Sequence, residues 1–167
     1  VIEFSKPFEK FEPIGEYGFY YRIHFKTEEG EQIGAKVALS STSPEGAELN
    51  YNAEVAEKDF DTVRKETLAK WQNELRKIRI YGASEEQNEI FYTGIYHMYV
   101  APSLFSDVDG TYRGADNEIH ANPGHDTYTT FSLWDTYRAK LPLMTITHPE
   151  RMDDVINTMI NIYFEQG

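Results

Sequence analysis

Most of the side chains in this sequence that could do chemistry lie between Ala101 and Arg138. Carboxylates, imidazoles, guanidinium groups and an indole are concentrated there: Asp107, Asp109, Arg113, Asp116, Glu118, His120, His125, Asp126, Trp134, Asp135 and Arg138. Polar loops between regular elements commonly carry binding sites. Carboxylates accept hydrogen bonds from hydroxyl groups, and a flat aromatic ring packs against the C–H face of a sugar. These residue types therefore favour saccharide chemistry.

The segment that begins at Asp107 has the spacing of a calcium loop. Asp107, Asp109 and Thr111 occupy the first, third and fifth positions, and Glu118 occupies the twelfth. A calcium loop of the EF-hand type needs glycine at the sixth position, and that residue is Tyr112. The pattern favours a turn in which the aspartate side chains bind their own backbone, and no metal ligand is predicted.

His120 and His125 bracket an Asn-Pro-Gly turn and raise the question of a metal site. Metal ligands need a spacing that a helix or strand holds rigid, and neither histidine has one. We expect a solvated loop here.

Trp134 and Asp135 follow Ser132, which is a candidate helix cap, and both fall in the first turn of the expected helix. In one interpretation Trp134 is a core residue, Asp135 satisfies free amides at the helix start, and Arg138 is an ion-pair partner. In the other, Trp134 and Asp135 face back over the preceding loop and bind a ligand. The pattern alone leaves both open.

The composition narrows the class of protein. A net charge of −12 with a pI near 4.8 disfavours nucleic acids and anionic membranes as partners, because both are negatively charged. An aromatic content of 14% is enough for a folded core. The absence of cysteine excludes disulfides and thiol chemistry. No apolar run approaches the roughly 20 residues that a membrane-spanning helix needs.

The first part of the chain has the alternating pattern of strands. Residues from Tyr17 to Lys26 alternate between apolar and polar, and so do those from Ile33 to Leu39, which predicts an antiparallel hairpin. Val1–Ser5 reads as a third strand. Residues 40–46 (SSTSPEG) are expected to form a loop.

From Asp59 the period becomes helical. Asp59 is the expected cap of a helix that reaches Leu75, and a short strand is expected over Lys77–Tyr81. Ser84 and Gln87 have capping-box spacing for a second helix, which should end near Pro102. The fold class is therefore α+β, with strands first and helices after about residue 58.

Two more helices are expected after the loop from Ala101 to Phe131, which we call the polar stretch. The first begins at Ser132 and is broken at Pro142, because proline lacks the amide hydrogen that a helix interior uses. The second begins at Pro149 and carries apolar residues at helical spacing to the end of the sequence.

Several segments resemble glycoside hydrolase family 92, the exo-acting α-mannosidases. The segments with the clearest similarity are FYT at 91–93, APSLFSDVDG-x-YRG at 101–114 and FSLWDTYR at 131–138. Further similar positions are Phe4–Phe8, Ser40, Ala47, Asn50, Glu54, Trp71, Glu74, Leu75, Pro142, Leu143 and Pro149–Arg151. The similarity covers nearly the whole sequence.

The resemblance implies an N-terminal β-sandwich and a C-terminal (α/α)6 barrel, with the active site between them. Residues 1–57 would end the sandwich, 58–80 would form a helical linker and a short strand, and 81–167 would supply the first helices and loops of the barrel. The sequence begins at Val1 and not at a methionine, and its first residues already have the pattern of a strand. We therefore expect a fragment of a longer protein.

The resemblance also implies calcium dependence and inversion at the anomeric carbon, which uses an acid and a base about 6.5–9.5 Å apart. In the family both groups and the calcium ligands lie downstream of Gly167, so no catalytic residue is expected in this chain. Trp134 and Asp135 are expected to bind the terminal mannose, with Asp107, Asp109 and Arg113 as possible loop contacts.

We therefore predict a fragment of a secreted or periplasmic bacterial α-mannosidase, inactive by itself, whose partners are mannose-containing glycans and the remainder of the parent chain. Two other hypotheses stay open: a stand-alone carbohydrate-binding or structural module, and a different (α/α) glycosidase such as a glucosidase or phosphorylase.

Overall fold

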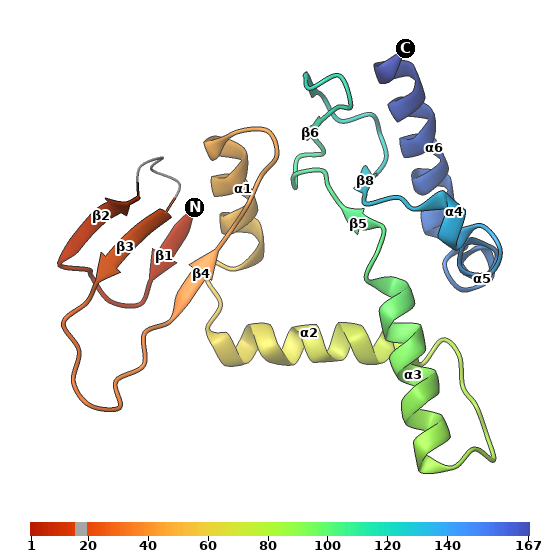
Figure 1. Ribbon diagram of the computed structural model, residues 1–167, viewed down its shortest axis with the longest axis horizontal. Coiled ribbons are helices and arrows are strands. Elements are labelled where there is room, and N and C mark those ends of the chain that lie inside the picture. The colour runs from red at the N-terminus through yellow and green to blue at the C-terminus, as the bar shows by residue number, and fades with distance from the viewer. Residues whose placement is uncertain (16–19) are drawn as a thin grey trace.

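The computed structural model describes residues 1–15 and 20–167. Its four N-terminal strands lie at one end of the molecule and helices α4, α5 and α6 lie at the other, with α2 extending between them (Figure 1). The chain contains both short antiparallel strands and helices, which confirms the predicted α+β class.

The N-terminal strands form two separate antiparallel pairs. β1 (Ile2–Phe4) pairs with β4 (Ala35–Val37), and β2 (Lys10–Ile14) pairs with β3 (Tyr20–His24). The predicted strand over Val1–Ser5 is confirmed.

The predicted hairpin between residues 17–26 and 33–39 is wrong, because the two strands have different partners. Alternation identifies a strand and its faces, but it does not identify the neighbour that accepts its hydrogen bonds. The sequence also missed β2, in which Pro13 and charged residues interrupt the apolar pattern. Residues 16–19 of the expected strand lie outside the described part of the chain.

Helix α1 (Pro44–Glu54) begins inside the segment that we expected to be a loop. Ser43 is its N-cap, and the Ser43 hydroxyl accepts a 3.0 Å hydrogen bond from the Gly46 amide. Pro44 follows at the first helical position, where its missing amide hydrogen has no cost. A serine followed by proline is a helix-start signal, and it would have predicted α1.

The two middle helices begin where their caps predict. Asp59 caps α2 (Phe60–Leu75), with a 2.7 Å bond from the Thr62 amide to its carboxylate. Ser84 and Gln87 form the predicted capping box of α3 (Glu85–Tyr99), which ends before Pro102. The predicted strand over 77–81 is wrong, because in the described ranges this segment has no strand neighbour to bind its backbone groups.

Four two-residue strands organise the polar stretch. β5 (Ser103–Leu104) pairs with β8 (Tyr128–Thr129), and β6 (Tyr112–Arg113) pairs with β7 (Ile119–His120). The stretch is therefore a folded loop with two small antiparallel ladders.

The helix expected from Ser132 to Pro142 is divided in two. α4 (Leu133–Thr136) is a single turn, and Pro142 lies in the first turn of α5 (Lys140–Thr147) instead of ending a helix. The first turn tolerates proline because its amides have no partner within the helix. Pro149 begins α6 (Pro149–Gln166), as predicted.

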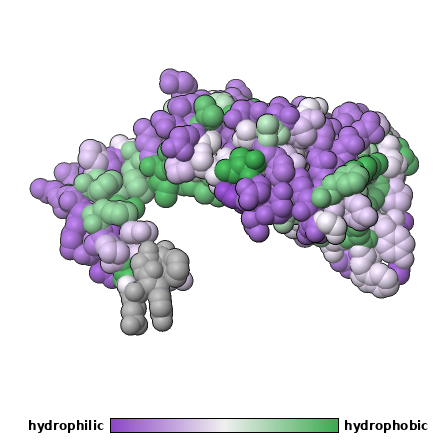
Figure 2. All heavy atoms as spheres, turned by 90° about the horizontal axis from the view of Figure 1, so that it is seen from above, coloured by the Kyte–Doolittle hydropathy of each residue, from purple (hydrophilic) through white to green (hydrophobic). Residues whose placement is uncertain are grey.

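A small core joins the polar stretch to the last helices. Tyr128, Met144, Met152 and Val155 are buried together, and Phe131, Leu141 and Met159 pack against them. Elsewhere many large apolar side chains remain exposed, and Figure 2 shows hydrophobic residues reaching the surface in several places among hydrophilic ones. Among the described residues, no helix has the length and apolarity to cross a bilayer.

Candidate substrate-binding site

Trp134 and Asp135 are consecutive residues on α4, three and four positions after Phe131, which packs against the core. The Trp134 side chain is 76% exposed, so it does not belong to the core. The Ser132 hydroxyl donates a hydrogen bond to the Asp135 carboxylate, and the Asp135 amide binds the Ser132 carbonyl at 3.2 Å. Within the described residues Trp134 is therefore not packed as a core residue.

The Arg138 guanidinium lies over the aromatic rings of Trp134 and Tyr137. Its guanidinium carbon lies 5.5 Å from the Trp134 ring centre and 5.2 Å from that of Tyr137, and its Nε donates a 2.8 Å hydrogen bond to the Tyr137 hydroxyl. A guanidinium over an aromatic face is attracted by the ring electrons and helps fix the ring orientation. The sequence had suggested an ion pair for Arg138 and gave no sign of this stacking.

Asp107 is buried, with 6% of its surface exposed, and three side chains donate to its carboxylate. The Ser40 and Thr42 hydroxyls each bind Oδ2 at 2.6 Å, and the Asn50 amide binds Oδ1 at 2.7 Å. The Asp107 carboxylate therefore joins the polar stretch to the segment that precedes and begins α1.

Arg113 contacts the same segment. Its Nε donates to the Ser41 carbonyl at 2.7 Å, Nη2 donates to the Thr42 carbonyl at 3.2 Å, and Nη1 donates to the Asn117 carbonyl at 2.6 Å. Asp109 is exposed and accepts from the Thr111 amide at 2.9 Å and hydroxyl at 2.7 Å, which lowers the pKa of Asp109. Asp109 thus forms the self-bonded turn that the sequence favoured over a calcium loop. The Asp107 carboxylate does not bind its own turn, because Ser40, Thr42 and Asn50 donate to it instead.

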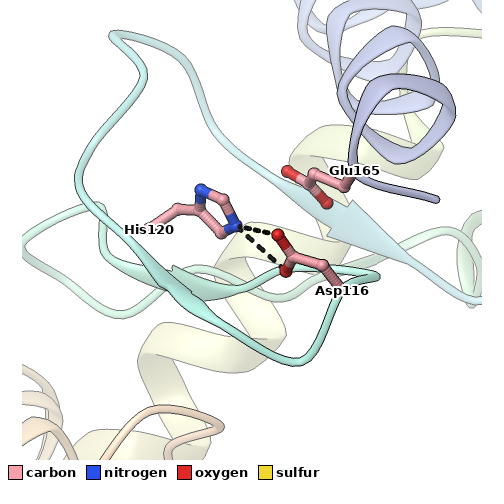
Figure 3. Close-up of side chains that lie close together, drawn as sticks. All are labelled: Asp116, His120 and Glu165. Atoms are coloured by element: carbon pink, nitrogen blue, oxygen red, sulfur yellow. Dashed lines mark hydrogen bonds and ion pairs between the residues drawn. The ribbon is translucent and has the colours of Figure 1, made fainter. Parts of the chain in front are cut away.

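Asp116, His120 and Glu165 come together although the sequence gave no signal for Glu165, which lies on α6 (Figure 3). His120 Nε2 lies 3.1 Å from both Asp116 oxygens, and Glu165 accepts from the Tyr112 hydroxyl at 2.7 Å and the Ala115 amide at 2.8 Å. His120, expected in a solvated loop, is therefore part of a hydrogen-bonded group.

The electrostatics of this group follow from those contacts. The bond to Asp116 raises the pKa of His120, while the Glu118 amide and then His120 lower the pKa of Asp116. Burial and the bond to Glu165 raise the pKa of Tyr112 to about 12. The bonds from Tyr112 and Ala115 to Glu165 join the polar stretch to α6.

Neither Asp107 nor the cluster of Asp116, His120 and Glu165 offers the ligands that a calcium ion needs. Calcium takes about 6–8 oxygen ligands, but the Asp107 oxygens are occupied by three donors. In the second group one candidate ligand is the His120 nitrogen, and both Glu165 oxygens already accept hydrogen bonds. We therefore assign no calcium ligand to these residues.

A buried histidine that the sequence did not single out joins α2 to α6. His148 Nε2 lies 2.7 Å from Glu74 Oε2, Nδ1 lies 2.8 Å from the Thr147 hydroxyl, and the Tyr99 ring packs edge-on against the imidazole at 4.7 Å. Burial alone would raise the pKa of Glu74, but the bonds from Lys77 and His148 outweigh it and lower that pKa. This contact joins the C-terminal end of α2 to the start of α6.

Comparison with known proteins identifies the family. Residues 46–167 match the glycosyl hydrolase family 92 catalytic domain, so the chain belongs to that family. Ser40 and Thr42 precede the matched region, whereas Asp107 and Arg113 lie within it. A search of curated protein sequences finds no match for the chain.

Solved structures show the same relationship. The family GH92 α-mannosidase BT3965 from Bacteroides thetaiotaomicron is 32% identical over 97% of this chain, with a TM-score of 0.85. Its complex with mannoimidazole gives 31% identity, the same coverage and a TM-score of 0.85. The GH92 family glycosyl hydrolase ccman5 is 27% identical over 80% of the chain, with a TM-score of 0.68.

The chain spans 24% of the Bacteroides thetaiotaomicron protein and 18% of ccman5. These relatives therefore contain large segments that have no counterpart in the residues described here.

Proposed function

We propose that this chain is part of an inverting exo-α-mannosidase that removes terminal α-mannosyl residues from glycans, and that it supplies one wall of the mannose pocket. Membership of family 92 supports the reaction class. The observation that carries the proposal is the exposed Trp134 ring next to the Asp135 carboxylate on α4.

Each side chain has a distinct role in this proposal. The Asp135 carboxylate accepts hydrogen bonds from two mannose hydroxyls, and such charge-assisted bonds are stronger than neutral ones. The Trp134 ring covers a C–H face of the sugar, while Arg138 behind it holds the ring in place. Ser132 orients Asp135 through its hydroxyl.

The rest of the parent protein would complete the active site. An inverting hydrolase needs an acid and a base about 6.5–9.5 Å apart, with a water molecule between them. We place both groups and the calcium ligands in the parent chain outside these residues, so the 167-residue chain alone should not hydrolyse mannosides.

The architecture belongs to the same proposal. Residues 1–57 would end a β-sandwich, 58–80 would be the linker, and 81–167 would begin an (α/α)6 barrel. The two antiparallel strand pairs at the N-terminal end and the three C-terminal helices support this division. We also propose a secreted or periplasmic bacterial protein, a location that suits an enzyme acting on glycans outside the cytoplasm.

Substitution of Asp135 in the full-length protein tests the proposal. Loss of two bonds to a charged group costs about 1.5–3 kcal/mol each, so Asp135→Ala should weaken mannoimidazole binding by about 100-fold or more. Titration calorimetry with mannoimidazole measures this change, and hydrolysis of α-mannosides gives a second readout.

Asp153→Asn is the matched control, because Asp153 is an exposed aspartate on α6 and is not part of the proposed site. It should bind like the wild type. Unchanged binding by Asp135→Ala would contradict the site, and chelator-sensitive mannoside turnover by the 167-residue chain alone would contradict the division of the active site.

A carbohydrate-binding module without catalysis is the second candidate, since the exposed Trp134 and Asp135 could bind mannose without an acid or base. Mannose binding by a full-length protein that hydrolyses no α-mannoside would favour it. Hydrolysis by the full-length protein would exclude it.

A further inference from the structure

The Asp107 carboxylate is the meeting point of two segments that are distant in the sequence. Its donors Ser40 and Thr42 lie outside the matched catalytic domain, and Asn50 lies on α1 within it. Asn50 also accepts from the Val108 amide at 2.8 Å and donates to the Leu39 carbonyl at 2.9 Å. The contact therefore binds both the side chain and the backbone of the polar stretch.

The packing leaves no room for a side chain between α1 and this carboxylate at Gly46. A Cβ atom at Gly46 would lie 2.5 Å from Asp107 Oδ2 and 2.7 Å from the hydroxyl oxygens of both Ser40 and Thr42. Glycine at this position lets α1 approach the carboxylate directly. Arg113 reinforces the contact by binding two carbonyl groups of the 40–43 segment.

A continuous set of contacts leads from Asp107 to Asp135. The residues just before Asp107 bind Thr127, through Phe105 N to Thr127 O at 2.8 Å and Ser106 N to Thr127 O at 3.3 Å. Thr127 leads into β8, which pairs with β5 and places Tyr128 in the core cluster that Phe131 packs against. The next residue after Phe131 is Ser132, whose hydroxyl binds the Asp135 carboxylate.

We propose that Asp107 is a positioning residue: by holding the 40–50 segment against the polar stretch, it fixes the β5–β8 ladder, and α4 with Trp134 and Asp135 follows β8 in the chain. This inference rests on the proposed function for its effect on mannosides. In the proposed architecture the 40–43 segment belongs to the sandwich side, so Asp107 also sets the distance between that side and the mannose-binding wall.

The test uses the full-length protein with Asp107→Leu, Asp107→Asn and the double variant Ser40→Ala/Thr42→Val. Leucine has a similar shape and accepts no hydrogen bond, whereas the asparagine amide can still bond to a hydroxyl of the 40–43 segment. Asp153→Asn serves as the control. All variants are assayed at a temperature where their near-ultraviolet circular dichroism matches that of the wild type.

Displacement of a binding group by about 1 Å costs up to about 100-fold in rate, so we expect kcat/KM for an α-mannoside to fall about 10- to 100-fold in Asp107→Leu, mainly through a higher KM. The Ser40→Ala/Thr42→Val variant should shift KM in the same direction, and Asp107→Asn should recover part of the loss. If the folded variants keep the wild-type kcat and KM and only melt earlier, Asp107 is merely structural and the inference is wrong.

Hydrogen exchange of residues 128–136 separates this inference from the proposed function. We expect faster exchange of these amides in Asp107→Leu and in the Ser40→Ala/Thr42→Val variant, which decides the question if Asp107→Leu does not fold. Unchanged exchange overturns the positioning role. A wild-type protein that neither hydrolyses α-mannosides nor binds mannoimidazole overturns the proposed function, and the exchange result still decides the role of Asp107.

Discussion

At the residue scale, the donors around a carboxylate decide its role in this chain. Asp107 is enclosed by two hydroxyls and an amide, Asp116 faces an imidazole, and Asp135 is held by one serine and otherwise faces solvent. An enclosed carboxylate has its acceptor positions filled, whereas Asp135 keeps acceptor capacity for a ligand. The surroundings of a carboxylate, more than its residue type, therefore distinguish the positioning role proposed for Asp107 from the binding role proposed for Asp135.

The ion pair between Asp116 and His120 gives a pH-dependent prediction. The pKa of His120 is raised above 6.5, so its contribution to stability is complete below pH 6.5 and is lost as the pH rises through the raised value. The pKa of Asp116 is lowered below 3.8, so its contribution is complete above pH 3.8 and is lost as the pH falls through the lowered value. Both contributions are complete between these limits.

Melting curves of the wild type and His120→Gln across pH 3 to 9 measure this effect. The difference in Tm should be largest between pH 3.8 and 6.5 and should decrease at both extremes. Glu118 and Glu165 also favour the protonated imidazole, so Glu118→Gln should narrow the difference at its alkaline end. A Tm difference that is constant with pH would contradict the ion pair.

The residues of the proposed mannose wall were indicated by the sequence, but most of the side chains that contact the polar stretch were not. The FSLWDTYR segment carried the family resemblance and indicated Trp134 and Asp135. The donors to Asp107 come from residues 40–50, and Glu165 reaches His120 from another helix. Contacts between distant segments depend on tertiary packing, which one sequence does not encode as a local pattern.

At the element scale, helices with capping signals were predictable and strand partners were not. Asp59 and Ser84 mark helix starts through bonds that span three residues, so the signal is local. β1 pairs with a strand more than thirty residues away, and nothing local distinguishes that partner from another alternating segment. The same limit explains the expected strand over 77–81, which found no neighbour in the described ranges.

Two glycines on helices give opposite predictions for the same substitution. Alanine is favoured over glycine in a helix by about 1 kcal/mol, and Gly94 on α3 has no atom within 4 Å of an added Cβ. Gly94→Ala should therefore stabilise the 167-residue chain. At Gly46 on α1 the added Cβ would overlap Asp107, Ser40 and Thr42, so Gly46→Ala should destabilise it by about 1–3 kcal/mol.

Thermal unfolding of both variants beside the wild type provides the measurement, with Gly94→Ala as the control for helix propensity. An increase in Tm for Gly46→Ala would show that the 40–43 segment can move away from Asp107 at little cost, and it would argue against a rigid contact there.

At the scale of the whole molecule, the chain exposes more apolar surface than a self-sufficient domain of its length. On α6 alone, Ile156, Ile160, Tyr163 and Phe164 are each at least 45% exposed. Such a face on a helix ordinarily packs against another element. The longer relatives have the additional chain that could cover it.

We therefore expect the 167-residue chain, expressed alone, to bind a hydrophobic dye and to self-associate. A full-length protein of the proposed kind should do neither, because its additional segments would cover this face. Dye fluorescence and sedimentation velocity measure the two effects. Ile160→Glu with Phe164→Glu should reduce both in the isolated chain, whereas substitutions of the exposed residues Glu85 and Glu86 on α3 should not. A monomeric chain without dye binding would contradict this prediction.

The anchors of the polar stretch have a consequence for synthesis on the ribosome. Asp107 is held by residues as early as Ser40, while Tyr112 is held by Glu165, more than fifty residues later. Translation proceeds at about 5–20 residues per second, so the first anchor is available some seconds before the second. The Asp107 contact can therefore form first. The polar stretch packs against α6 only after that helix has emerged from the exit tunnel.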